Sequence, residues 1–122
     1  MAELLHLPTF ADARGSLTVI ERELPFTVRR VYFMYACGPA ERGGHRHRRT
    51  IQGLVCVAGS CTVDWNDGSS KGRTRLETPE QLLLLQPADW HVMHSFTPDA
   101  VLLVVASEPY DPNDYVTEGY SE

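Results

Sequence analysis

The sequence predicts an all-β protein of the jelly-roll barrel type, and three observations lead to this fold class. Short runs of β-branched, aromatic and leucine residues recur at roughly ten-residue spacing, each followed by a turn signal. No window of about a dozen residues has the apolar period of a helix. The 122 residues suffice for one hydrophobic core and leave no room for a second. We therefore expect a single domain over residues 1–122, closed as a jelly roll.

The expected strands are short, and residues that favour turns separate them. An N-terminal candidate covers residues 4–7 and is suited to pair with the sheet edge of a second chain. The number and spacing of the other candidates fit an all-β sandwich or barrel. These are residues 16–21, 29–36, 51–58, 60–65, 72–77, 81–86, 92–96 and 100–107.

Local signals define the ends and faces of particular elements. Asn66-Asp67-Gly68 predicts a type I′ hairpin turn, because Asp-Gly supplies the positive φ angles of that turn. Asp111 and Pro112 favour a helix start, so Asp111 to Tyr115 predicts a short C-terminal helical turn. Alternation in the last strand predicts a core-facing stripe of Val101, Leu103 and Val105.

The charge of the chain argues against a general nucleic-acid binder. Its net charge is −5, whereas such proteins carry a basic excess. Several arginines are nevertheless close together in the sequence, and guanidinium groups suit an anionic small ligand. This group consists of Arg42, Arg46, Arg48 and Arg49.

The three cysteines, Cys37, Cys56 and Cys61, predict reduced thiols. Their number is odd and no C-x-x-C pair is present, which argues against a disulfide framework and against a zinc site. The N-terminus lacks the basic and apolar regions of a signal peptide. The longest apolar run, residues 100–106, is far shorter than the ~18 residues of a membrane span. We expect a cytoplasmic protein that does not associate with membranes.

The most informative segment carries two histidines separated by one residue. On an extended strand His45 and His47 project to the same face, since side chains repeat every two residues. Gln52 and Gly59 follow them, and His91 precedes a later strand. Imidazole titrates near neutrality and can therefore take up and return a proton. The pattern predicts a site for acid–base catalysis.

This arrangement resembles the two-part motif of the cupins, in which H-x-H precedes an acid, a glycine and a later histidine. Metal-binding cupins carry glutamate at the position of Gln52. A neutral amide is a weaker ligand for a divalent cation than a carboxylate. We therefore expect no required metal.

Further motifs extend over nearly the whole chain. They are Asp12-Ala-Arg-Gly-Ser-Leu17, Val31-Tyr-Phe-Met-Tyr35, Arg42-Gly-Gly-His-Arg-His47, Gln52, Trp90-His91 and Ala106-Ser-Glu-Pro-Tyr-Asp-Pro-Asn-Asp-Tyr115. In this order and spacing they resemble the dTDP-sugar 3,4-ketoisomerases, a family of WxcM-like cupins. The sequence departs from the family pattern at Arg46, where alanine is usual, and at Gln86 and Ala88.

The resemblance implies an isomerase of deoxysugar biosynthesis that converts a dTDP-4-keto-6-deoxy-hexose into its 3-keto isomer. It implies a homodimer that uses no cofactor and no metal. It implies that His47 is the catalytic base and His45 its partner, although the spacing alone does not order the two. The reaction removes the proton on C3, forms an enediol and delivers a proton to C4.

The resemblance also implies substrate-binding residues around the two histidines. Arg42 would neutralise the diphosphate or orient the sugar, and Arg14 would lie near the sugar pocket. Tyr32 and Tyr35 fall on opposite faces of one strand. We expect Tyr35 to face the ligand, because it lies nearer the histidine segment. The remaining candidates are Gln52, Trp90 and His91.

Two other functions stay open on the sequence alone. One is a metal-dependent cupin enzyme, which Gln52 argues against. The other is a non-catalytic cupin that only binds a nucleotide sugar or other small ligand in the same pocket. The residues fix neither the nucleotide nor the configuration of the product at C4.

Overall fold

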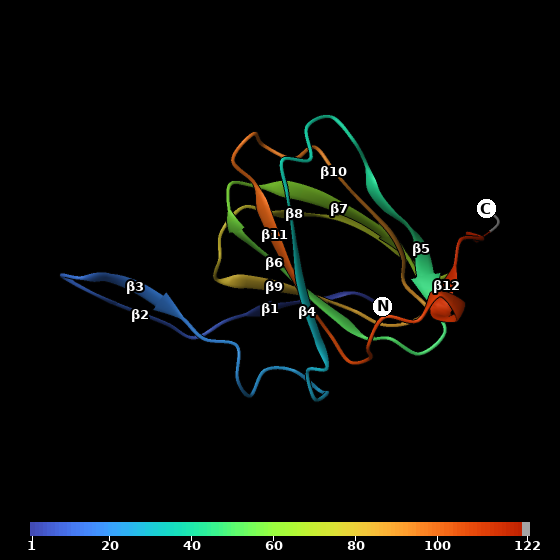
Figure 1. Cartoon of the computed structure of the whole chain (residues 1–122), viewed down its shortest axis with the longest axis horizontal. Helices are drawn as coiled ribbons and strands as arrows, with labels where there is room; N and C mark the ends of the chain where they lie inside the picture. Colours follow the sequence, from blue (N-terminus) through green and yellow to red (C-terminus); the bar gives the residue numbers. More distant parts are fainter. Residues whose placement is uncertain (121–122) are drawn as a thin grey trace.

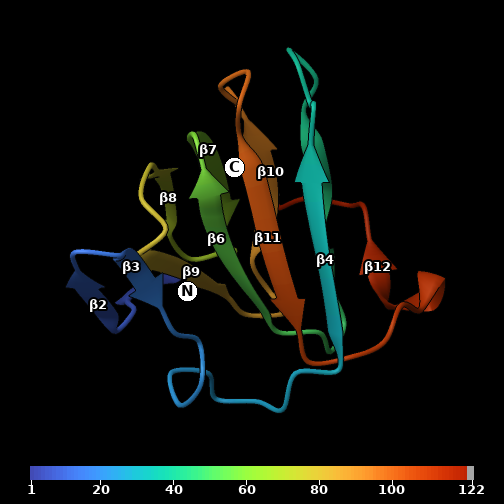
Figure 2. The same ribbon diagram turned by 60° about the vertical axis from the view of Figure 1, so that its left-hand side comes forward.

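The computed structural model describes residues 1–120 as two facing antiparallel sheets and a projecting hairpin (Figure 1, Figure 2). The first sheet has the strand order β1-β9-β6-β11-β4, and the second has the order β12-β5-β10-β7-β8. The first contains β1 (Glu3–His6), β9 (Gln81–Leu85), β6 (Gln52–Ala58), β11 (Val101–Ala106) and β4 (Arg30–Tyr35). The second contains β12 (Tyr115–Val116), β5 (Arg42–His47), β10 (Trp90–His94), β7 (Cys61–Asn66) and β8 (Lys71–Leu76).

The all-β prediction is confirmed, but the closed barrel is corrected to an open sandwich. Within residues 1–120, no strand of the first sheet is hydrogen-bonded to a strand of the second. The edge strand β4 pairs with β11, while β5 is flanked by β10 and β12. Large polar and aromatic side chains line a pocket between β4 and β5, where the edges of the two sheets stay apart.

The main core lies between the two sheets. Alternate residues of β6, β9 and β11 point inward, and they meet residues of β7, β8 and β10. Complete burial of a leucine or valine side chain stabilises the fold by about 1.5–3 kcal/mol. The members at most 1% exposed are Leu54, Cys56, Cys61, Val63, Leu76, Leu83, Leu85, Leu102 and Val104.

A second, smaller cluster covers part of the outer face of the first sheet. Leu7, Val55, Leu82 and Leu84 are buried there. Ile20, Leu24 and Phe26, from the segment that joins the hairpin to β4, pack over them. The apolar residues of this irregular segment therefore act as a cover for the sheet.

The remaining outer face of the first sheet is apolar and open. The stripe expected in the core is wrong in its direction, because Leu102 and Val104 point inward while Val101 and Leu103 are only partly buried. Its third member, Val105, is 6% exposed, but it lies with Leu82 of the second cluster over Gly53. Neighbouring strands add four exposed apolar side chains, which we call the outer patch. They are Val31 (58% exposed), Phe33 (59%), Tyr35 (66%) and Val57 (43%).

The hairpin of β2 (Thr9–Asp12) and β3 (Gly15–Thr18) extends away from both sheets (Figure 1). Only its second arm was predicted, within residues 16–21. Phe10 and Leu17, which pair across it, are both largely exposed. The N-terminal strand β1 pairs with β9 of its own chain. It is the edge strand of the first sheet, so the expected pairing of its other side with a second chain stays a prediction.

The two predicted turns form with small differences. The β7–β8 hairpin is confirmed, but Asn66 pairs with Lys71, so the loop has four residues and is not a two-residue type I′ turn. Asp67 stabilises this longer loop by accepting hydrogen bonds from the amides of Ser69 and Ser70. The C-terminal turn is a single 3₁₀ turn, η1 (Pro112–Asp114). Among residues 1–120, no helix is long and apolar enough to span a membrane.

Candidate active site

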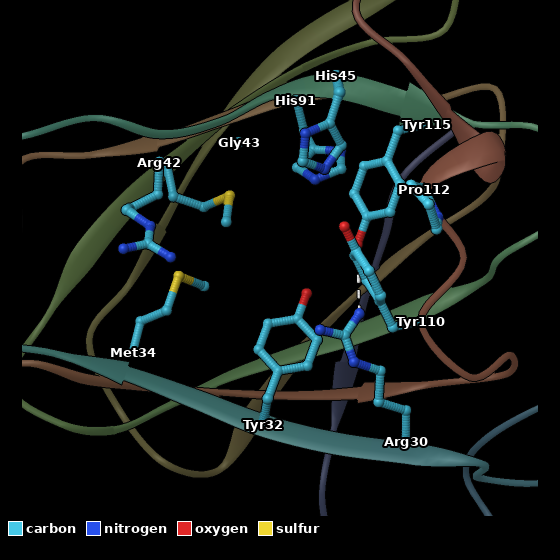
Figure 3. A pocket seen from close by; sticks show the side chains of 11 residues that line it. Arg30, Tyr32, Met34, Arg42, Gly43, His45, His91, Tyr110, Pro112 and Tyr115 are labelled. Carbon is cyan, nitrogen blue, oxygen red and sulfur yellow. Dashed lines mark hydrogen bonds between the residues drawn. The ribbon is translucent and has the colours of Figure 1, made fainter.

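A pocket of about 410 Å³ opens between the edges of the two sheets, where β4 faces β5 (Figure 3). Side chains from β4 form one wall, and β5 and β10 form the other. The segment around η1 closes one end. The lining residues are Arg30, Tyr32, Met34, Arg42, Gly43, His45, His91, Met93, Tyr110, Pro112 and Tyr115.

A bulge in β5 sets the direction of the histidine wall. His91 of β10 pairs with His45, while the next residue, Val92, pairs with Gly43, so Gly44 is an extra residue in β5. Gly43 has a φ of +86°, and a Cβ atom there would lie 2.9 Å from the carbonyl oxygen of His91. Glycine is therefore required for the close approach of β5 to β10.

Three histidines from these strands gather at the pocket wall. The ring centres of His45 and His47 are 5.1 Å apart, and those of His45 and His91 are 5.0 Å apart. One ring nitrogen of each histidine lies within 4.8 Å of the others. His45 and His91 line the pocket, whereas His47 is 6% exposed and lies behind them. Figure 3 shows the side chains of His45 and His91 pointing from the same wall into the pocket.

Asp114 holds the ring of His47. Nδ1 of His47 lies 2.9 Å from a carboxylate oxygen of Asp114, and both side chains are almost fully buried. The Thr50 hydroxyl and the backbone amide of Arg49 donate to the same carboxylate. Burial opposes ionisation of Asp114, but these three donors lower its pKa overall. Because a carboxylate only accepts, Nδ1 of His47 carries the proton and Nε2 keeps a free lone pair.

Burial keeps the histidine cluster neutral. It lowers the pKa of His91 to about 4, and it lowers the pKa of His45 to about 4 with a smaller contribution from His47. Burial also lowers the pKa of His47, although Asp114 opposes that shift. Nδ1 of His91 donates to the backbone carbonyl of Asp89 at 2.9 Å, which leaves its Nε2 as the acceptor. The cluster therefore presents proton acceptors near neutral pH.

The opposite wall carries cationic and phenolic groups. The Arg30 guanidinium lies 4.2 Å from the ring centre of Tyr32 and donates to the Tyr115 hydroxyl at 3.3 Å. Gln52 donates from Nε2 to the Tyr32 hydroxyl at 2.9 Å, and burial raises the pKa of that tyrosine. Arg42 is the other arginine among the lining residues. The pocket thus combines neutral bases with two positive charges.

Some predicted site residues lie in or beside this pocket. Arg42, His45 and His91 line it directly, His47 lies behind His45, and Gln52 reaches it through Tyr32. Sequence reasoning did not assign several others, although Tyr110, Asp114 and Tyr115 belong to one motif that it quoted and Tyr32 belongs to another. The missed residues are Arg30, Tyr32, Tyr110, Asp114 and Tyr115.

Three predicted residues lie elsewhere. Tyr35 was expected to face the ligand, but it is 66% exposed on the outer face of β4. Tyr32 lines the pocket instead. Trp90 points away from the pocket, because it alternates with His91 on β10, and its indole donates to the carbonyl of Thr117. Arg14 lies in the turn of the projecting hairpin, where it pairs with Asp12 at 2.6 Å.

Comparisons with known proteins agree on one family. The family model described as FdtA, WxcM-like, C-terminal, matches residues 1–122. A curated relative, the TDP-4-oxo-6-deoxy-alpha-D-glucose-3,4-oxoisomerase of Aneurinibacillus thermoaerophilus, is 39% identical over 119 residues, which are 95% of this chain and 86% of the relative.

Solved structures give the same relationship. A 3,4-ketoisomerase from Helicobacter canadensis superposes with a TM-score of 0.91 at 34% identity, covering 96% of this chain and 90% of the other. QdtA, a sugar 3,4-ketoisomerase from Thermoanaerobacterium thermosaccharolyticum solved with TDP, superposes with a TM-score of 0.92 at 34% identity, with 96% and 88% covered. The chain therefore belongs to the FdtA-type, WxcM-like family of TDP-sugar 3,4-ketoisomerases.

Proposed function

We propose that this chain converts TDP-4-keto-6-deoxyglucose, or a close 4-keto-6-deoxy-hexose analogue, into the 3-keto isomer. The observation that carries the proposal is the pair of neutral histidines, one held by Asp114, at a pocket with two arginines. The substrate class comes from the relatives, since one is named for this isomerisation and a variant of QdtA was solved with TDP-4-keto-6-deoxyglucose.

The reaction is an internal transfer of hydrogen. A base removes the proton on C3 while the C4 carbonyl takes up charge, which gives an enediolate. Proton transfer between the two oxygens and protonation of C4 then leave the carbonyl at C3. The electron pair that leaves the C3–H bond ends in the new C4–H bond, so no external oxidant is consumed. We propose that turnover needs neither a cofactor nor a metal.

We assign His47 as the base and His45 as its partner. The Asp114 carboxylate keeps Nε2 of His47 unprotonated and stabilises the imidazolium that forms when it accepts the proton. His45 lies on the pocket wall next to it and can move the hydroxyl proton. Arg42 and Arg30 would bind the diphosphate or stabilise the enediolate through their positive charges.

We also propose that the enzyme is a cytoplasmic homodimer. The outer patch of Val31, Phe33, Tyr35 and Val57 supports a dimer, since contiguous exposed apolar side chains mark interaction surfaces. In a two-fold dimer the same surface of both chains meets, so this patch would face the same patch of a second copy. The free thiols of Cys37, Cys56 and Cys61 fit a reducing compartment.

The test of the activity is turnover of TDP-4-keto-6-deoxyglucose followed by NMR. We expect a 3-keto product, and in D₂O we expect deuterium at C4 wherever the base exchanges with solvent before it returns the proton. A protein that binds the keto-sugar tightly but leaves it unchanged would be a binding module, and the proposal would fail.

A further inference from the structure

We propose that the C-terminal segment is clamped onto the outer face of the second sheet and that this clamp positions the histidines of the pocket. The clamp consists of Arg46, Trp90 and Tyr120. Arg46 is its central positioning residue, since it acts through the C-terminal segment and does not line the pocket. The clamp itself stands on the contacts of these residues, whereas its effect on turnover rests on the proposed function.

Arg46 makes three contacts with the C-terminal segment. It lies between His45 and His47 on β5, so its side chain points to the opposite face of the strand. Its Nε donates to the carbonyl of Glu118 at 3.3 Å, and its Nη1 donates to the Tyr120 hydroxyl at 3.2 Å. The guanidinium carbon lies 4.6 Å from the centre of the Tyr120 ring. A planar guanidinium suits both the hydrogen bonds and the stacking, so one side chain holds two residues of the segment.

Other contacts attach the same segment to neighbouring strands. The Tyr120 hydroxyl donates to the carbonyl of Ala88 at 2.6 Å. The Tyr120 ring packs over Gly68, where a Cβ atom would lie 3.0 Å from it. The Trp90 indole donates to the carbonyl of Thr117 at 3.3 Å. The segment is therefore attached to β5, to β10 and to the β7–β8 loop.

The clamp follows directly after the shortest strand of the second sheet. β12 has two residues, Tyr115 and Val116, which pair with His47 and Arg46 of β5. So short a strand forms few ladder hydrogen bonds, and its place depends on what holds the chain on either side. Before β12 the Asp114 carboxylate is anchored by Thr50 and the amide of Arg49. After β12 the clamp supplies the attachment.

Tyr115 connects the clamp to the histidines. Its ring centre lies 4.7 Å from that of His45 and 4.7 Å from that of His47. Figure 3 shows Tyr115 beside His45 at the pocket wall. His47 is also held by Asp114, whereas His45 has no carboxylate partner among residues 1–120. Loss of the Tyr115 contact would therefore leave the His45 ring less constrained than the His47 ring.

Hydrogen exchange without any sugar measures the clamp itself. Arg46 stands where alanine is usual in the family, so we expect Arg46→Ala to fold. The amides of residues 115–120 should exchange at least about 10-fold faster in this variant, because the contacts that hold the segment are lost. Arg73→Ala is the matched control, since Arg73 lies on the same sheet and pairs with Asp64. Wild-type exchange rates in Arg46→Ala would overturn the clamp.

Turnover of TDP-4-keto-6-deoxyglucose measures the positioning. Arg46→Ala should lower kcat by about 5- to 10-fold and change KM by less than about 2-fold, because a misdirected ring slows proton transfer while the opposite wall still binds the sugar. Tyr120→Ala should give the same pattern. The double variant should be no slower than the slower single variant, since both substitutions break one contact.

Three results in the turnover assay would overturn the positioning role. They are a kcat within about 2-fold of wild type in both single variants, additive losses in the double variant, or an equal loss in Arg73→Ala. Near-UV circular dichroism identifies a variant that fails to fold, and the other single variant then decides. A wild-type protein without turnover would refute the proposed function instead, while hydrogen exchange would still decide whether the clamp exists.

Discussion

Asp114 and His47 form the contact on which the proposed chemistry depends most directly. The carboxylate accepts from His47, Thr50 and the amide of Arg49, so its position is fixed from three sides. It comes from the C-terminal turn, whereas His47 ends β5, and the two residues are 67 positions apart. The turn thus has a chemical role as well as a structural one.

His47→Asn should abolish most activity while keeping the fold. The asparagine amide can still donate to Asp114, but it does not titrate near neutrality and cannot carry the C3 proton. We expect turnover to fall by about 10²–10⁴, with little change in thermal stability. His45→Asn should slow turnover less. Near-normal turnover of His47→Asn in the NMR assay would show that another residue is the base.

Asp114→Asn tests the positioning role of the carboxylate. Removing its charge should lower the pKa of His47 further, because Asp114 is what raises it against burial. The acidic limb of the kcat/KM profile should therefore move to lower pH, with kcat reduced on the order of 10²-fold.

Asp111→Asn is the matched control, since Asp111 caps the same turn and pairs with Arg49 without touching His47. An unshifted acidic limb in Asp114→Asn would mean that Asp114 only supports the fold.

The sequence predicts the histidine wall but not the opposite wall. The two-residue spacing of His45 and His47 defines one face of a strand, and Arg42 and His91 belong to motifs quoted with them. On β4 the alternation is equally clear, yet Tyr32 and Tyr35 both look suited to a pocket. The outer face of β4 is more apolar than its inner face, which carries Arg30, so side-chain type points to the wrong face as the buried one. Asp114 depends on a contact between distant segments, which spacing cannot supply.

At the scale of elements, the bulge in β5 positions the histidines through two residues with positive φ angles. Gly43 and Gly44 both have positive φ angles, but only Gly43 approaches β10 closely. The pairing of His45 with His91 depends on that approach. The bulge is therefore the local feature that brings two histidines from different strands together.

Gly43→Ala should lower both stability and activity. The positive φ costs any non-glycine residue about 1–2 kcal/mol, and the new methyl group would meet the His91 carbonyl at 2.9 Å. Gly44→Ala carries the same φ penalty, but no atom lies within 4 Å of its added methyl group. The free energy of unfolding, measured by urea denaturation, and kcat should thus both fall more in Gly43→Ala than in Gly44→Ala. Equal losses in the two variants would contradict the role of the close approach.

Strand positions were predicted well, while their faces were predicted only in part. Most predicted runs agree with the observed strands to within one or two residues. The stripe on β11 points the other way because both faces of that strand are apolar: one meets the core and the other borders the outer patch. Thr9–Asp12 was missed because it forms only as the partner of β3 in the projecting hairpin.

At the scale of the whole molecule, the buried histidines make stability depend on pH. Burial lowers the pKa of His45 and His91 to about 4, below the ordinary 6.5, so the unfolded chain binds protons more readily. The contribution of the two neutral histidines to the free energy of unfolding is complete above about pH 6.5 and is lost as the pH falls toward 4. For His91, which is 1% exposed, the loss is about 1.4 kcal/mol per pH unit in that window.

Urea denaturation between pH 7 and pH 4.5, in EDTA, measures how steeply the free energy of unfolding falls with pH. His91→Asn should flatten it, because asparagine can keep the hydrogen bond to the Asp89 carbonyl without titrating. The same slope in the variant and in the wild type would exclude His91 as its source.

Phe33→Asp tests the proposed dimer. A charge in the middle of the outer patch must be desolvated on association, so we expect the mass measured by light scattering to fall to that of one chain. Arg22→Asp changes the charge of an exposed loop residue and should leave the mass unchanged. A single-chain mass for the wild-type protein at micromolar concentration would refute the dimer.

Arg30, Arg42, Tyr110 and Tyr115 line the pocket yet belong to neither hydrophobic cluster. They stand on sheet edges and on the C-terminal turn, away from the packed interior. Substitution of these four residues would change which ligands fit the pocket without opening a cavity in the core. Substrate preference can therefore diversify within such a fold by changes at its rim, while the sandwich beneath keeps its sequence constraints.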